Sequence, residues 1–239
     1  MILQTQDLWC KFGGVAAVAG VDFSLEDGEL RCLIGANGAG KSTFFKMLTG
    51  QLKPTSGTIM LFGQDVTGAS PHTIARLGVG VKTQVPNLFN QLTAHENLYI
   101  AARRHLPERQ ATEAAGDMLE EIQLSSYATT VAGRLAHGHR QWLELGVILI
   151  TEPKLVLLDE PAAGMTVGEV ERTVALLNRL RGKRSFIIVE HDMHFIRRIA
   201  QKVTVFHRGQ VLVEDDIDAV LRNSKVREAY LGRRGGEAR

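Results

Sequence analysis

The feature that most limits the fold of this 239-residue chain is the segment Gly35–Ser42, which reads GANGAGKS. It fits the pattern G-x-x-x-x-G-K-[ST], in which glycines let backbone N–H groups close around phosphate oxygens. The apolar run Leu30–Ile34 precedes the segment and predicts a buried strand, and Ser42–Thr49 is predicted as a helix. An unrelated glycine-rich turn does not require a strand before it and a helix after it, so this context predicts a nucleotide-binding α/β domain.

The residues of this loop have distinct predicted roles. Lys41 can reach the β- and γ-phosphates, and the hydroxyl of Ser42 suits Mg²⁺. We therefore expect ATP and Mg²⁺ as cofactors. The neighbours expected to bind the nucleotide are Asn37, Gly38, Ala39, Gly40 and Thr43.

Polar side chains follow two other predicted strands, at the edge of a parallel sheet where ligands bind. Asp159 and Glu160 come directly after Leu155–Leu158, and His191 follows Ser185–Val189 closely. Asp159 would hold Mg²⁺ through water, and Glu160 would polarise the attacking water as a general base. His191 would hydrogen-bond the γ-phosphate. Each could instead be a surface acid or a structural histidine, and the phosphate loop favours the catalytic interpretation.

The order of predicted elements indicates an α/β fold with a mainly parallel sheet, antiparallel strands near the start and a helical insert. Together with the phosphate loop, it resembles a P-loop NTPase (RecA-like) core with an antiparallel β subdomain. The first thirty residues read as short antiparallel strands with turn signals at Gly13–Gly14 and Gly20. The capping box Thr93–Glu96 opens a helical stretch. We expect a core of residues 1–85 and 150–231, a helical signature subdomain of residues 86–149, and a disordered tail over 232–239. The remaining predicted strands are Thr58–Phe62, Gly78–Val81, Val203–Phe206 and Gln210–Val213, with helices over Val167–Arg181 and Met193–Ile199.

The net charge of the chain and the length of its apolar runs limit the kinds of partner and location that we expect. The formal net charge is +2, which is too balanced to indicate nucleic acid as a partner. The first residues lack a signal-peptide pattern, and the apolar runs are far shorter than the roughly 20 residues of a membrane span. We expect a cytoplasmic or peripheral protein whose two cysteines, Cys10 and Cys32, are buried thiols.

Five segments stand in the order of a known family: GANGAGKS, Gln84, LAHGH over 135–139, LVLLDEP over 155–161, and VEHD around His191. The chain thereby resembles the nucleotide-binding subunits of ATP-binding cassette (ABC) transporters, up to about Arg233. The resemblance implies that Phe12 stacks on adenine with Val18 nearby. It also implies that Gln84 binds Mg²⁺, supports catalysis and contacts the membrane domains.

The same resemblance implies an assembly. Two cassettes would sandwich two ATP molecules, and residues such as Ala136 and Gly138 of one signature segment would complete the site of the other subunit. The expected partners are membrane permease subunits, a second ATP-binding subunit of the same or another kind, and, indirectly, a periplasmic substrate-binding protein. The expected location is the cytoplasmic face of the inner membrane.

Two segments depart from the family pattern. The usual L-S-G-G-Q or L-S-H-G-Q is here LAHGH, so Ala136 replaces a serine and His139 replaces a glutamine. Thr166 stands where the family has an aspartate. Besides a transport ATPase, these departures leave open an ATP-binding subunit with weak hydrolysis.

Other segments are similar to one branch of the family, the importers of hydrophobic amino acids and amides: FGG, ARLGVG, EPAAGMT and YLGR. HGHRQWLELG over 137–146 and EHDMHFIR over 190–197 look most like the urea-importer cassette, so urea or short amides are the expected cargo. A branched-chain amino-acid importer is the alternative, although its cassettes usually carry a longer insert between Asn97 and Gln123. Soluble ABC proteins acting on ribosomes or DNA usually carry two cassettes or a long coiled coil, neither of which the sequence indicates.

Overall fold

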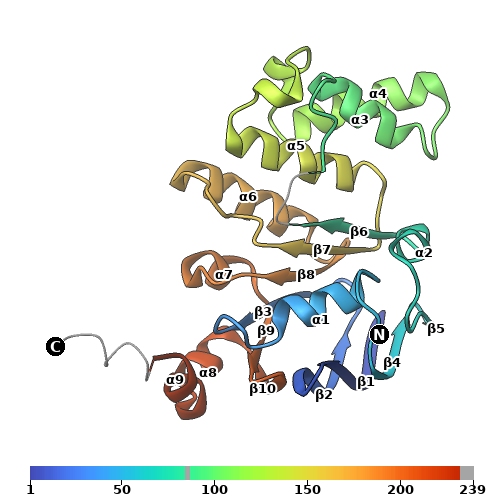
Figure 1. Cartoon of the computed structure of the whole chain (residues 1–239). Helices are drawn as coiled ribbons and strands as arrows, with labels where there is room; N and C mark the ends of the chain where they lie inside the picture. Colours follow the sequence, from blue (N-terminus) through green and yellow to red (C-terminus); the bar gives the residue numbers. More distant parts are fainter. Residues whose placement is uncertain (84–86, 232–239) are drawn as a thin grey trace. The chain divides into compact units, whose positions relative to one another are not determined.

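A computed structural model describes residues 1–83 and 87–231 (Figure 1). The chain divides into two compact units: Met1–Leu77 with Arg181–Arg239, and Gly78–Leu180. The predicted site residue Gln84 and the predicted tail over 232–239 lie outside the described residues. The sequence-based division at 85/86 and 149/150 remains a prediction.

The first unit contains an antiparallel sheet with the strand order β2-β1-β4-β5. The strands are β1 (Leu3–Phe12), β2 (Val15–Leu25), β4 (Ser56–Leu61) and β5 (Gln64–Asp65). Gly13 has a φ of 57°, which permits the tight turn between β1 and β2. The antiparallel strands were predicted, but the turn signal at Gly20 was wrong because β2 runs through it.

The same unit contains a second set of strands, which carries the phosphate loop. β3 (Leu30–Gly35) lies between β8 (Ser185–Val189) and β9 (Lys202–His207) and is parallel to both, while β10 (Gln210–Asp215) pairs antiparallel with β9. Every residue of β3 and β8 is buried, as continuous apolar runs in parallel sheets predict. The helices of this unit are α1 (Lys41–Leu48), α2 (Pro71–Arg76), α7 (Met193–Ile199), α8 (Ile217–Arg222) and α9 (Ser224–Leu231).

Aromatic packing and a buried ion network fix this part of the core. The ring of Phe44 in α1 lies 5.4 Å from that of Phe23 and 5.2 Å from that of Phe206, centroid to centroid. The buried Arg31 pairs with Glu29 at 2.6 Å and with Glu214 at 2.5 Å. A buried guanidinium is tolerated only when such partners compensate its lost hydration. Helix α1, which starts at the phosphate loop, is thus held in the core of this unit by the packing of Phe44.

Over its described residues, 78–83 and 87–180, the second unit combines two parallel strands with four helices. β6 (Val79–Lys82) pairs with β7 (Leu155–Asp159). Helices α3 (Ala94–Ala102), α4 (Glu108–Glu121) and α5 (His137–Leu149) pack against one another, as Figure 1 shows, and α6 (Val167–Leu180) follows β7. The predicted capping box is confirmed, since Thr93 and Glu96 exchange both hydrogen bonds. Two short 3-10 turns, Ser125–Tyr127 and Ala132–Arg134, join α4 to α5.

The two cysteines are free and buried, as predicted. Burial raises the pKa of both thiols, and at Cys32 the nearby Glu190 carboxylate raises it further. Within residues 1–83 and 87–231, no helix is both long and apolar enough to cross a membrane.

Candidate active site

The phosphate loop is shaped by three glycines at positive φ: Gly35 at 154°, Gly38 at 78° and Gly40 at 106°. A Cβ atom at Gly35 would lie 2.5 Å from the carbonyl oxygen of Phe206, and one at Gly40 would lie 2.5 Å from that of Ala17. Neither position can therefore hold another residue without backbone movement. At Gly38 the space is open, and only the backbone conformation favours glycine.

Helix α1 begins at the end of this loop, with Gly40 as its N-cap residue. Since glycine has no side chain to accept a hydrogen bond, the first N–H groups of the helix remain available to an anion. The ammonium group of Lys41 donates to the carbonyl oxygens of Gly35, at 2.6 Å, and Ala36, at 3.1 Å. Ser42 is exposed beside it and Thr43 is half-buried. The arrangement concentrates donors and positive charge, as phosphate binding requires.

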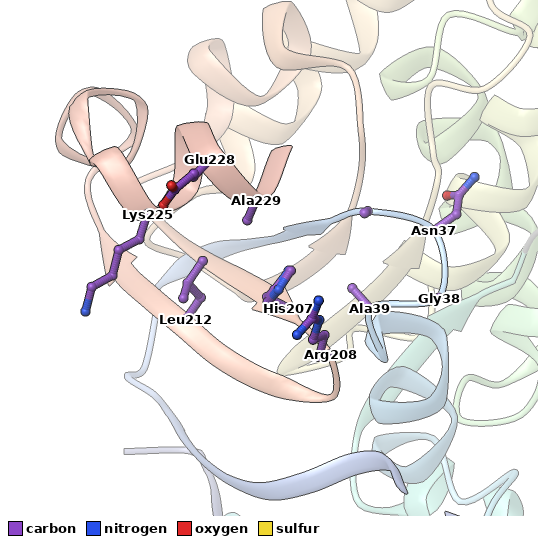
Figure 2. Close-up of a pocket in the computed structure, with 10 residues that line it drawn as sticks. Asn37, Gly38, Ala39, His207, Arg208, Leu212, Lys225, Glu228 and Ala229 are labelled. Atoms are coloured by element: carbon purple, nitrogen blue, oxygen red, sulfur yellow. The ribbon is translucent and has the colours of Figure 1, made fainter. Parts of the chain in front are cut away.

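An open cavity of about 580 Å³ lies beside the loop (Figure 2). Volumes of this size are typical of small-molecule sites. Its walls come from the phosphate loop, from the β9–β10 turn and from α9, through Ala36, Asn37, Gly38, Ala39, His207, Arg208, Leu212, Lys225, Glu228 and Ala229. Figure 2 shows Arg208 and His207 beside Ala39, and the Gly209 N–H donates to the Ala39 carbonyl oxygen at 2.9 Å, so the β9–β10 turn is a direct neighbour of the loop.

The two residues expected near adenine differ in exposure. Phe12 ends β1 and is 53% exposed, so its ring is free to stack on a base. Val18 is fully buried and lies opposite Cys10 in the β1–β2 pair. The side chain of Val18 packs in the core, because inward and outward positions alternate along β2, and the expectation that Val18 lies near adenine stays a prediction.

The predicted acids lie in the second unit. Asp159 is the last residue of β7, Glu160 follows it, and both are half-buried. Glu160 has a φ of 48°, a conformation that costs a non-glycine residue of order 1–3 kcal/mol and is concentrated at active sites. Its carbonyl oxygen accepts a hydrogen bond from Ala163 N–H at 3.2 Å. A strained backbone at the proposed general base is a feature that the sequence pattern did not reveal.

The signature segment opens helix α5. Ala136 is the N-cap residue, with extended ψ of 157°, and it cannot supply the side-chain oxygen that serine would. Gly138 is buried, and a Cβ atom there would collide with the Glu169 carboxylate. A negative charge thus already lies against the first turn of α5.

Thr166, the departure from the family's aspartate, forms a capping box with Glu169 at the start of α6. The Glu169 carboxylate accepts hydrogen bonds from the Thr166 backbone N–H and hydroxyl, both at 2.8 Å. The hydrogen bond from the Thr166 backbone N–H is the main cause of a lowered pKa at Glu169, and the bond from the Thr166 hydroxyl lowers this pKa further. The spacing T-x-x-E over 166–169 is a capping signal that sequence reasoning missed.

Helix α5 also carries buried polar residues that sequence reasoning missed. The Glu144 carboxylate accepts from the Asn87 N–H at 2.9 Å and lies 3.6 Å from the Lys82 ammonium. Burial raises the pKa of Glu144. Two turns earlier, the exposed His137 places its Nε2 atom 3.2 Å from both the Ala163 carbonyl oxygen and the amide of the buried Gln141. Through Ala163, α5 contacts the turn that follows Glu160.

His191 follows β8 in the first unit and is exposed, with 67% of its side chain accessible. The buried Glu190 accepts hydrogen bonds from the His191 N–H at 2.8 Å and the Asp192 N–H at 3.2 Å. Asp192 in turn caps α7 by accepting from His194 and Phe195 N–H. Glu190 was not predicted as a site residue, although its place in VEHD beside the histidine was a signal. It shapes the turn that presents His191.

The predicted residues are therefore distributed over both units. Phe12, Val18, residues 37–43 and His191 belong to the first unit. Ala136, Gly138, Asp159 and Glu160 belong to the second. Among the described residues, no group of three or more His, Cys, Asp or Glu side chains could by itself hold a metal ion. The Ser42 hydroxyl and the Asp159 carboxylate are hard oxygen donors, which fit Mg²⁺ carried by phosphates and water.

Comparison with known proteins identifies the family of the chain. The ABC transporter family model matches residues 18–163. The high-affinity branched-chain amino acid transport ATP-binding protein BraF of Pseudomonas aeruginosa is 37% identical over 97% of this chain and 98% of its own length. LivG of Escherichia coli, named for the same transport, is 34% identical over the same shares.

Solved structures show the same mixed α/β fold. The crystal structure of the ADP conformation of MJ1267, an ATP-binding cassette of an ABC transporter, superposes with a TM-score of 0.86 at 30% identity, covering 97% of this chain and 98% of that one. The dimeric post-hydrolysis structure of the cassette MJ0796, at 21% identity and a TM-score of 0.80 over 90% of this chain and 98% of that one, shows the fold alone. The predicted fold class is confirmed, and the chain belongs to the ABC transporter family as an ATP-hydrolysing cassette coupled to transport.

Proposed function

We propose that this cassette powers an importer of hydrophobic amino acids, with branched-chain amino acids as the first candidate cargo. The observation that carries the proposal is the 37% identity to BraF, because it extends over 97% of this chain and 98% of that protein. LivG, with its 34% identity over the same shares, supports the same cargo. The alternative cargo of the sequence analysis is thus better supported than urea.

The proposed chemistry assigns each residue a task. Phe12 stacks on adenine, while the N–H groups of the loop and of α1, together with Lys41, hold the β- and γ-phosphates. Glu160 accepts a proton from the attacking water, whose oxygen bonds to the γ-phosphorus as the bond to the β–γ bridging oxygen breaks. ADP and inorganic phosphate leave. His191 hydrogen-bonds the γ-phosphate, and this hydrogen bond is lost when the phosphate leaves.

Mg²⁺ is expected beside Ser42, Asp159 and Gln84, where it would neutralise developing charge on the phosphates. Gln84 is also proposed to contact the membrane domains. The proposed assembly contains two cassettes on the cytoplasmic face of the inner membrane, with permease subunits and a periplasmic binding protein delivering the cargo. In it, Ala136 and Gly138 of each cassette face the nucleotide of the other.

Urea or a short amide remains a second candidate, favoured by one specific observation. The segments HGHRQWLELG over 137–146 and EHDMHFIR over 190–197 resemble the urea-importer cassette. The compact α3–α4 pair, with helices of 9 and 14 residues, agrees with the short insert expected of that cassette.

Transport by the assembled complex separates the two candidates. The full chain would be reconstituted in proteoliposomes with its permease subunits and binding protein, and ATP-dependent uptake of radiolabelled leucine and urea would be compared. Leucine uptake supports the first proposal, and urea uptake without leucine uptake replaces it with the second. ATP hydrolysis without uptake of either would reject both cargo classes while leaving the ATPase in place.

A further inference from the structure

The β9–β10 turn, residues 208–209, lies directly against the phosphate loop. We propose that Gly209 is a positioning residue for the phosphate loop. It fixes the direction of the Gly40 N–H and links the loop to strand β2, which follows Phe12 in the β1–β2 hairpin. The proposal rests on the proposed nucleotide site and assigns to it a residue from outside the sequence motifs described above.

Two backbone hydrogen bonds of Gly209 carry the proposal. Its N–H donates to the carbonyl oxygen of Ala39 in the phosphate loop at 2.9 Å. Its own carbonyl oxygen accepts from the Ala19 N–H in β2 at 2.8 Å. A single buried residue therefore links the phosphate loop to the strand that continues from the Phe12 hairpin.

The bond to Ala39 bears on nucleotide binding through the geometry of the peptide unit. The carbonyl of Ala39 and the N–H of Gly40 belong to one planar trans peptide and point in opposite directions. Fixing the Ala39 oxygen on one side of the loop therefore fixes the direction of the Gly40 N–H on the other. Because hydrogen bonds in a chain polarise one another, the same contact also strengthens that N–H as a donor.

Close packing shows that this contact is built into the backbone. Gly209 has a φ of 81°, and a Cβ atom there would lie 3.0 Å from the Ala17 carbonyl oxygen. A Cβ atom at Gly40 would lie 3.2 Å from Gly209 Cα and 2.5 Å from the same Ala17 oxygen. The backbones of Ala17, Gly40 and Gly209 thus meet without side chains between them.

The other end of the loop is held by the same hairpin. A Cβ atom at Gly35 would lie 2.5 Å from the Phe206 carbonyl oxygen, and the Phe206 ring packs on Phe44 of α1. Both ends of the phosphate loop are therefore supported by residues 206–209. A displaced turn would disturb the loop amides without touching Lys41 or Glu160.

The test compares Gly209→Ala with Gly63→Ala in the full chain. Gly63, in the turn between β4 and β5, has a φ of 78° and open space around its would-be Cβ, so it reproduces the backbone strain without the loop contact. Both variants should lose some unfolding free energy. Only Gly209→Ala should raise the Kd for ADP and the KM for ATP, by about tenfold, or about 1.4 kcal/mol, with kcat within about twofold of wild type.

Several outcomes would overturn the proposal. One is unchanged nucleotide affinity in Gly209→Ala, and another is an equal loss in both variants, which would attribute the effect to strain alone. If Gly209→Ala does not fold, hydrogen exchange on the wild-type chain decides: ADP should slow exchange of the Gly209 amide more than that of the Gly63 amide, and equal changes reject the proposal. A wild-type chain that binds no nucleotide would instead reject the proposed function, and this inference with it.

Discussion

Helices α1 and α5 begin alike but have opposite electrostatic surroundings. Both start after a residue without a side-chain oxygen, Gly40 in one case and Ala136 in the other, so their first N–H groups lack a side-chain cap. The start of α1 is flanked by the ammonium group of Lys41. The start of α5 is faced by the carboxylate of Glu169, which packs against Gly138. A helix start therefore predicts an anion site only when its neighbours do not already supply the negative charge.

The negative charge at the start of α5 links the two segments that depart from the family pattern, at Thr166 and at Ala136. Thr166 replaces an aspartate and holds the Glu169 carboxylate through two hydrogen bonds at 2.8 Å. Glu169 in turn lies against the signature segment, in which Ala136 has replaced a serine. We expect the signature segment to stabilise phosphate less well than the phosphate loop does. In an assembly that pairs this chain with a normal cassette, one site would be fast and the other slow.

The largest expected effect is a loss of ATP turnover in a variant that still binds the nucleotide. Glu160→Gln keeps the shape of the side chain but cannot accept a proton, so ATP turnover should fall by about 10²–10⁴-fold while nucleotide affinity persists. Steady-state ATPase and equilibrium binding measure the two quantities. Glu152→Gln is the matched control, because Glu152 shares the positive φ, 52° against 48°, in the same unit. Wild-type turnover in Glu160→Gln would remove Glu160 as the base.

Removing the cation beside α1 should make its start behave like that of α5. Lys41→Ala deletes a charge-assisted contact of about 1.5–3 kcal/mol, so the Kd for MgATP should rise roughly 10- to 100-fold. Isothermal titration calorimetry measures the change. Lys46→Ala, at an exposed position in the last turn of the same helix, should leave the affinity near that of wild type. If both variants bind alike, the asymmetry between the two helix starts has no functional meaning.

Restoring the serine at the start of α5 should have a smaller effect, of the opposite sign. Ala136→Ser adds an N-cap oxygen and a hydroxyl donor, so homodimer turnover should rise several-fold and unfolding free energy by about 1 kcal/mol. Ala136→Asp is the control that separates the two effects, since it caps the helix but brings no hydroxyl. Equal turnover in both variants would assign any gain to helix stability.

The smallest effect concerns the capping box that holds Glu169. Hydrogen bonds from Thr166 lower the pKa of this carboxyl in the folded state, so its stabilising contribution is present above the unfolded pKa, about 4.3, and is lost as pH falls through the folded value. Glu169→Gln should cost about 1 kcal/mol of unfolding free energy at pH 7 and progressively less in acid. Chemical denaturation from pH 7 to pH 3 measures the difference. Glu120→Gln, an exposed acid on α4, should show no such trend.

Sequence reasoning succeeded where the determinants are local. The phosphate loop, the buried strands on either side of β3 and the capping box at Thr93 all follow from patterns within about ten residues. It failed where distant segments meet. Nothing near Gly138 indicates that the Glu169 carboxylate excludes a side chain there, and nothing near Ala39 indicates Gly209. The burial of Val18 was also not foreseen, because an assignment by resemblance carried no information on which face of β2 the side chain occupies.

The buried cysteines make this chain convenient for spectroscopic labelling. Cys10 is 2% exposed and Cys32 is fully buried, and burial raises the pKa of both thiols, which lowers their thiolate population at neutral pH. A maleimide probe added to the folded protein should therefore react with a cysteine introduced on the surface and spare the native pair. Single-molecule distance measurements between labelled cassettes can then test the proposed pairing of two cassettes during turnover, with both native cysteines retained in the core.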